Sequence, residues 1–309
     1  MIVSVCADKG APGVTTLATV LAMAWPSERV LLEADCSGAD LPFRLRHADR
    51  DRLLDPQPSV LALAADARGA LPTGGLLRYS QPCSLGVPVI PGALSAEAFG
   101  PMARLWPQVA AAAVGWSGTV IADLGRFQPG DPALPVVKAS TVVLLLARAD
   151  LEGLYHLRER VTEIAGTVAD PTQDRSPVAV VVRARPGRDG KAAIGQVQQL
   201  LNACGSAVPV MGLFADDPDG AAGLRAGTMS RRLLGCELVR SGAALAETLL
   251  SWWPQLRTTC AISPATTLPI ASPSTAAAAG RAVVSCDPQP DPQPDREPDV
   301  VSGLGPVSG

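Results

Sequence analysis

The stretch that decides the fold is IVSVCADKGAPGVTTLATVLAMA, residues 2–24, and within it the loop KGAPGVTT at residues 9–16. The loop follows an apolar run, residues 2–6, and opens an apolar segment, residues 15–24, that is typical of a helix. A strand, a glycine-bearing loop and a helix in this order let backbone N–H groups and the helix N-terminus surround a phosphate. The sequence therefore predicts a phosphate-binding loop at this point.

The loop departs at two positions from the usual pattern G-x-x-x-x-G-K-[ST]. Asp8 stands where that pattern has its first glycine, and Val14 stands where it has its lysine. Gly13 remains where the backbone must pass close to phosphate, and Thr15 remains where a hydroxyl is needed to bind Mg²⁺. The chain has only three lysines, and one of them, Lys9, lies near the start of the loop.

With this lysine, the loop resembles the deviant phosphate loop K-G-G-x-G-K-[ST]-[ST] of the MinD/ParA ATPases, a family that includes the CpaE/TadZ-like proteins of Tad pilus assembly. Ala11 replaces a glycine of that pattern, and Val14 replaces its second lysine. The resemblance implies that Lys9 reaches the phosphates held by a second subunit. It also implies that ATP is bound by the following residues: Gly10, Ala11, Pro12, Gly13, Val14, Thr15 and Thr16.

Acidic residues end two further apolar runs. VLLEAD at residues 30–35 is typical of a buried parallel strand followed by acids, and residues 118–126 contain a short strand ending at Asp123. Acids at this edge of an open α/β sheet lie where ligands bind. In the resembled family they imply that Asp35 positions the attacking water and that Asp123 holds Mg²⁺ together with Thr15. The alternative is that the acids of residues 30–35 are solvated loop carboxylates.

The resembled family places residues that follow its sixth and seventh strands against the base. Arg183 and Asp216 occupy these places here, and we expect both to contact the bound nucleotide. Arg183 departs from the family's asparagine, so the sequence leaves selectivity for adenine open. The run Asp-Asp-Pro at residues 216–218 is explained equally well as a helix start with an aspartate as its cap.

Apolar strands alternate with amphipathic helices along the chain. Further strands are predicted at residues 85–92, 141–147, 178–182 and 208–213, and further helices at residues 59–67, 95–114 (interrupted at Pro101 and Pro107), 151–165 and 242–253. This alternation predicts an α/β fold, a mostly parallel sheet of about seven strands with helices on both faces. It agrees with a P-loop NTPase fold of the MinD/ParA-like kind.

Two regions are expected. Residues 1–257 form the nucleotide-binding domain. Residues 258–309 are rich in Ala, Pro, Ser and Asp and include the direct repeat DPQPDPQP, so they are expected to be a disordered tail.

Composition limits the function classes. The net charge of −3 provides no basic field that would attract nucleic acid. Seven cysteines without C-x-x-C spacing argue against a zinc site and favour a cytoplasmic protein with reduced thiols. We recognise no signal peptide and no apolar run of the roughly 18 residues that a membrane span needs. The helix at residues 242–253 lacks a basic face, so packing on the sheet is favoured over membrane contact.

Two hypotheses of function follow. The first is a MinD/ParA-like switch that binds ATP and Mg²⁺ as a homodimer, hydrolyses ATP slowly, and works with an unidentified protein partner. Such a switch would serve chromosome or plasmid partition, or Tad-type pilus or secretion assembly. The second is a non-hydrolysing scaffold or localisation factor, because Val14 brings no positive charge to the phosphates. An iron–sulfur reductase would need cysteines near Asp123, and none lies between Cys83 and Cys204.

Overall fold

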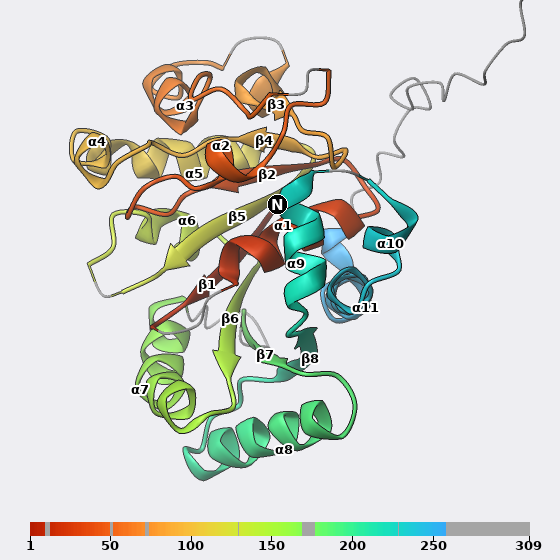
Figure 1. Cartoon of the computed structure of the whole chain (residues 1–309). Helices are drawn as coiled ribbons and strands as arrows, with labels where there is room; N and C mark the ends of the chain where they lie inside the picture. Colours follow the sequence, from red (N-terminus) through yellow and green to blue (C-terminus); the bar gives the residue numbers. More distant parts are fainter. Residues whose placement is uncertain are drawn as a thin grey trace, which may run out of the picture. The chain divides into compact units, whose positions relative to one another are not determined.

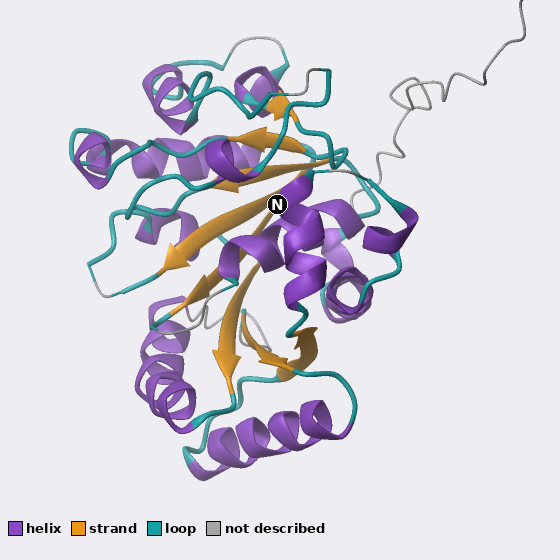
Figure 2. Ribbon diagram, in the orientation of Figure 1, coloured by secondary structure: helices purple, strands orange, loops and turns teal. Residues whose placement is uncertain are grey.

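An eight-stranded sheet with the order β3-β4-β2-β5-β1-β6-β7-β8 organises the described part of the chain (Figures 1 and 2). Every neighbouring pair is parallel except β3 with β4. The strands are β1 (Ile2–Ala7), β2 (Arg29–Glu33), β3 (Gln81–Pro82), β4 (Pro88–Ile90), β5 (Thr119–Arg126), β6 (Val142–Arg148), β7 (Val178–Ala184) and β8 (Val210–Ala215). The predicted mostly parallel α/β sheet is confirmed, and the two-residue strand β3 is the one that the sequence did not indicate.

The computed structural model describes residues 1–9, 13–49, 52–71, 74–128, 130–168, 177–227 and 229–257. The expected tail, residues 258–309, lies outside the described residues. The helices are α1 (Val14–Ala24), α2 (Leu41–Arg44), α3 (Val60–Asp66), α4 (Ala96–Phe99), α5 (Trp106–Gly115), α6 (Leu134–Lys138), α7 (Leu151–Val168), α8 (Arg188–Ala203), α9 (Pro218–Ala226), α10 (Arg231–Leu234) and α11 (Glu237–Trp252). Short 3-10 turns occur at Gly75–Tyr79, Ala103–Leu105 and Pro254–Leu256.

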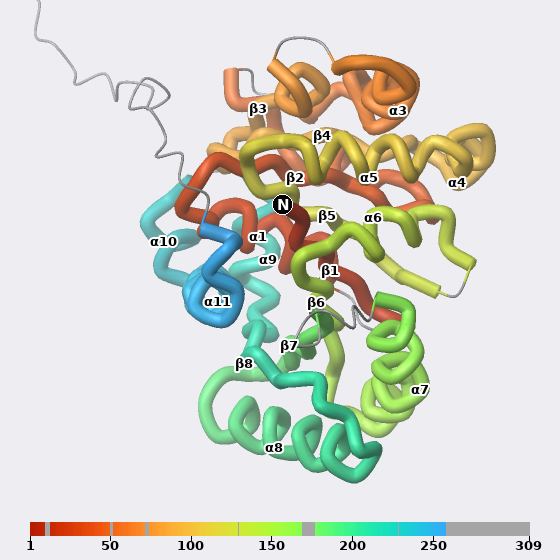
Figure 3. The backbone as a smooth tube through the Cα atoms, turned by 180° about the vertical axis from the view of Figure 1, so that it is seen from behind, coloured from red at the N-terminus to blue at the C-terminus, as the bar shows by residue number. Residues whose placement is uncertain are grey.

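Helices cover both faces of the sheet, which Figures 1 and 3 show from opposite sides. The side chains of β1 alternate between two apolar clusters: Ile2 and Cys6 join one, and Val3 and Val5 join the other. The first cluster includes residues of α3, α5, α6, α7 and α8, and the second includes residues of α1, α9 and α11. A strand buried on both sides must be apolar at every position, which explains the continuous apolar runs in the sequence.

Two of the predicted helices have different bounds in the structure. The predicted helix at residues 95–114 is interrupted near Pro101 as expected, because α4 ends at Phe99. Pro107 does not interrupt it, because it lies in the first turn of α5, where no N–H is needed. Helix α11 begins at Glu237, five residues before the predicted start at Gly242, and packs on α1 and β8. None of the described helices combines the length and the apolar composition that spanning a membrane requires.

Candidate functional site

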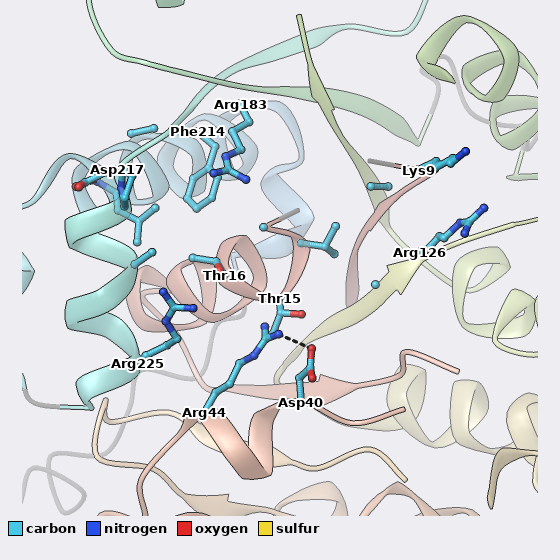
Figure 4. Close-up of a pocket in the computed structure, with 18 of the residues that line it drawn as sticks. Lys9, Thr15, Thr16, Asp40, Arg44, Arg126, Arg183, Phe214, Asp217 and Arg225 are labelled. Atoms are coloured by element: carbon cyan, nitrogen blue, oxygen red, sulfur yellow. Dashed lines mark hydrogen bonds and ion pairs between the residues drawn. The ribbon is translucent and has the colours of Figure 1, made fainter. Parts of the chain in front are cut away.

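A cavity of about 640 Å³ lies at the carboxyl edge of the sheet, beside the first turn of α1 (Figure 4). The ends of β1, β5, β7 and β8 form its walls together with residues of α1, α2 and α9. This is the edge at which open α/β sheets bind ligands, and the volume suits a small organic ligand. Of the predicted site residues that the structure describes, six line this cavity: Lys9, Gly13, Val14, Thr15, Thr16 and Arg183. Asp35, Asp123 and Asp216 are not in its lining.

The second half of the predicted phosphate loop lies on the wall of this cavity. Gly13 precedes α1 with φ of 121°, a conformation that glycine adopts without strain, and its carbonyl accepts the N–H of Leu17. Thr15 and Thr16 line the cavity in the first turn of the helix. The side chain of Val14 is only 6% exposed and belongs to the apolar core. The expected contacts of Gly10, Ala11 and Pro12 lie outside the described residues.

Asp123 and Thr15 lie together, as the sequence predicts. Asp123 is 1% exposed at the end of β5, next to β1. Its Oδ1 accepts the N–H of Gly125 at 3.1 Å, and its Oδ2 is buried without a hydrogen-bond partner among the described residues. Burial raises the pKa of Asp123 to about 7, although a hydrogen bond with Thr15 lowers it and the charge of Glu33 raises it further.

The pair formed by Asp123 and Thr15 fits a hard divalent cation. An orphaned carboxylate oxygen beside a threonine hydroxyl provides oxygen ligands of the type that Mg²⁺ prefers, and such sites are completed by phosphate and water. Within the described ranges, no group of three or more His, Cys, Asp or Glu side chains could hold a metal ion by itself. A cation at this point would therefore need oxygen atoms from a bound phosphate.

Glu33 is a structural residue rather than a solvated carboxylate. It is 1% exposed at the end of β2, and burial raises its pKa. Its carboxylate accepts the N–H groups of Asp40 at 2.6 Å, Leu41 at 2.8 Å and Gly92 at 2.9 Å. These three bonds fix the segment from β2 to α2 against the chain that leaves β4. The alternative interpretation as a solvated acid is wrong for Glu33.

Asp35 lies in the segment that Glu33 holds, directly behind the cavity wall. A Cβ atom on Gly125, which lines the cavity, would collide with the carboxylate of Asp35. The N–H of Ser37 donates to Asp35 Oδ1 at 2.8 Å, and burial raises the pKa of Asp35. The structure thus brings Asp35 close to the end of β5, in contact with the wall that Gly125 forms.

Arg183 and Asp216, predicted to face the base, form an ion pair in which Nη2 and Oδ1 are 2.6 Å apart. Arg183 lines the cavity, and the wall beside it is formed by Asp217 rather than by Asp216. The carboxylate of Asp217 caps α9 by accepting the N–H of Gly220 at 2.8 Å, which lowers its pKa. The helix-cap interpretation is therefore correct for Asp217.

Among the described residues, five cations line the cavity, and they come from five different segments of the chain: Lys9, Arg44, Arg126, Arg183 and Arg225. Figure 4 shows Lys9 and Arg126 on the side opposite Asp217 and Arg225. Arg44 is paired with Asp40 at 2.6 Å. Sequence reasoning selected only Lys9 and Arg183, because Arg44 and Arg225 reach the cavity from short helices that carry no recognisable motif.

Asp8, at the position of the missing first glycine, connects the phosphate loop to α7. Its Oδ1 accepts the Nε–H of Arg160 at 2.8 Å, and its Oδ2 lies 3.1 Å from Nδ1 of His156. The carbonyl of Asp8 accepts the Nε–H of Arg126 at 3.0 Å. The residue before Lys9 is thus held from two sides.

Comparison with known proteins identifies the fold of this chain. No family model and no curated protein matches the sequence. Solved structures do match: a ParA family ATPase from Chlorobium tepidum TLS has a TM-score of 0.61 at 15% identity, covering 80% of this chain and 98% of that chain. The chain has the MinD/ParA ATPase fold. The cell division ATPase MinD of Pyrococcus furiosus has a TM-score of 0.58 at 19% identity, covering 81% and 98%. MinD of Pyrococcus horikoshii OT3, complexed with Mg-ADP, has a TM-score of 0.58 at 17% identity, covering 80% and 95%.

Proposed function

We propose that this chain is a nucleotide-dependent switch that binds ATP and ADP with Mg²⁺ in the cavity at the start of α1. The observation that carries the proposal is the unpartnered oxygen of Asp123, buried beside the Thr15 hydroxyl at the N-terminus of a helix. Backbone N–H groups and a helix dipole at that terminus favour a phosphate. Mg-ADP is also the ligand named for the similar MinD of Pyrococcus horikoshii.

The residues of this chain would have three roles in the proposed site. Asp123 and Thr15 would hold Mg²⁺, which supplies the positive charge that neutralises phosphate oxygens. Thr16 and the first turn of α1 would orient the phosphates. Asp35 would position the attacking water from behind Gly125, and because the loop has Val14 in place of a lysine, hydrolysis is expected to be slow.

The switch is completed by a second copy of the chain and by a protein partner. We propose that ATP joins two copies, with Lys9 of each copy reaching the phosphates held by the other. Lys9 is exposed and lines the cavity, which supports this arrangement. The dimer would then position a cellular machine in chromosome or plasmid partition, or in pilus or secretion assembly, in the cytoplasm.

A second candidate is a scaffold that binds no nucleotide. Val14 favours it, because a buried aliphatic side chain replaces the lysine of the phosphate loop. The two candidates differ in one measurable property, which is affinity for a nucleotide.

Calorimetric titration of the full chain with ADP and ATP, with and without Mg²⁺, tests the first candidate. We expect saturable binding that is tighter with Mg²⁺ than without it. Asp123→Asn should lower the affinity for nucleotide measured with Mg²⁺ by about tenfold or more, since a charged ligand of the cation is lost. Asp150→Asn is the matched control, because Asp150 pairs with Arg148 beyond the end of β6 and away from this cavity. Absence of binding at millimolar nucleotide would favour the scaffold.

A further inference from the structure

The second half of the phosphate loop, residues 13–16, contains no cation of its own. Val14 is buried in the apolar core, and the side chains of Gly13, Thr15 and Thr16 are uncharged. A nucleotide phosphate carries several negative charges that must be paired once they are removed from water. In place of the loop lysine, a side chain from another part of the chain can bring positive charge to the start of α1, in addition to Mg²⁺ and Lys9.

The guanidinium of Arg183 already lies against this part of the loop. A Cβ atom placed on Gly13 would be 3.4 Å from Nη1 of Arg183 and 3.9 Å from its Cδ. The residue belongs to β7, and its position in the sheet pairs with Phe214 of β8, which also lines the cavity (Figure 4). The contact thus joins two segments about 170 residues apart in the sequence.

Arg183 is held in this position before any ligand arrives. Its Nη2 donates to Oδ1 of Asp216 at 2.6 Å, and its side chain is only 23% exposed. A long side chain that is already fixed loses less conformational entropy when it binds a ligand. Arg44 and Arg126 are paired as well, with Asp40 and with the carbonyl of Asp8. The close approach of its guanidinium to Gly13 is what distinguishes Arg183.

We propose that Arg183 replaces the missing loop lysine and contacts the phosphates of the nucleotide at the N-terminus of α1, as a positioning cation supplied from β7. The inference rests on the proposed nucleotide binding and adds the source of its positive charge. Guanidinium is suited to this task because its donors form a planar fork that matches phosphate oxygens and it stays charged at every working pH. Asp216 orients the fork and does not neutralise the phosphates.

The test compares affinities for Mg-ADP, Mg-GDP and inorganic tripolyphosphate by calorimetry on the full chain. Arg183→Gln is expected to weaken all three ligands by a similar factor, about tenfold to a hundredfold, which is the usual effect of losing one charged hydrogen bond. Arg183→Lys keeps the charge and should lose less than Arg183→Gln. Arg148→Gln is the matched control, because Arg148 is the register partner of Arg183 on β6, has its own aspartate partner, and is absent from the wall of this cavity.

A rescue experiment tests whether Arg183 acts by bringing a positive charge to the phosphates. Val14→Lys in the Arg183→Gln background returns a cation to the loop and should recover most of the lost affinity for tripolyphosphate. The proposal is overturned if Arg183→Gln binds all ligands like the unmodified chain. It is also overturned if the variant weakens the nucleotides but not tripolyphosphate, since that pattern would place Arg183 on the base. If the unmodified chain binds none of the three ligands, the proposed function itself fails, which is a separate result.

Discussion

Asp123 is a residue of the proposed site that lowers the stability of the folded chain. A buried carboxylate with one unpartnered oxygen, close to the charges of Glu33 and Asp35, disfavours its own ionised form. An apolar or neutral side chain would be more stable at this position. Residues that weaken the fold in this way are typical of sites where binding of a ligand restores the lost interaction.

The raised pKa of Asp123 predicts how stability depends on pH. The folded carboxyl titrates at about 7 and the unfolded one at about 3.9, so between these values the folded state binds a proton that the unfolded state lacks. The contribution of Asp123 to the free energy of unfolding should therefore fall as pH rises from about 4 to 7. Above pH 7 Asp123→Asn should be more stable than the unmodified chain by roughly 1–3 kcal/mol, and near pH 4 the two should be similar. Melting curves at several pH values check this, with Asp150→Asn as a control; a variant less stable at pH 8 would contradict it.

Site residues that belong to a local sequence pattern were predictable, and residues that only the fold brings to the cavity were not. Thr15 and Asp123 belong to local patterns, a loop before a helix and an acid after a strand, and the sequence predicted both and their pairing. Arg44 and Arg225 were missed because only the fold brings α2 and α9 to the cavity. Arg183 was selected, but its approach to the phosphate loop depends on the order of the strands and has no local signal.

At the scale of elements, the helices and strands were predictable where an apolar run was long and unbroken. All seven predicted strands are present, and β3 was missed because two residues in an antiparallel pair carry no periodicity. The start of α11 was missed because Gly242 resembles a boundary. In the structure Gly242 lies inside the helix, where the lack of a side chain allows close contact with Val20 of α1.

Gly242→Ala is expected to destabilise the fold although alanine is the better helix former. A Cβ atom at this position would collide with Cγ1 of Val20, and overpacking of a buried contact costs about 1–3 kcal/mol, against a gain in helix propensity of about 1 kcal/mol. Gly195→Ala is the matched control, because Gly195 is exposed in α8 with no atom within 4 Å of the added Cβ. Urea unfolding should show opposite shifts of the midpoint for the two variants. Equal stabilisation by both would show that the α1 and α11 contact tolerates a side chain.

At the scale of the whole molecule, the strand order assembles the site. β1 is central, with β5 on one side and β6 on the other, and the register places Val5 opposite Asp123. The loop after β1 therefore lies beside the acid of β5, although the two are far apart in the sequence. The sequence predicted the strands but not their order, because pairing between distant strands depends on packing of the complete sheet.

The last prediction concerns the assembly of two such molecules. Lys9 is exposed at one side of the cavity, next to Asp8, whose side chain is held by α7. An exposed lysine at the edge of the cavity can neutralise phosphates of a facing copy, so Lys9→Ala should abolish dimerisation with Mg-ATP. A single copy should still bind nucleotide within about tenfold of the unmodified affinity. Lys191→Ala, on the exposed side of α8, is the matched control and should dimerise normally. Sedimentation velocity with and without Mg-ATP distinguishes the results: if Lys9→Ala dimerises as well as Lys191→Ala, Lys9 does not act across the interface, and if neither the unmodified chain nor the control dimerises, the switch operates as a monomer.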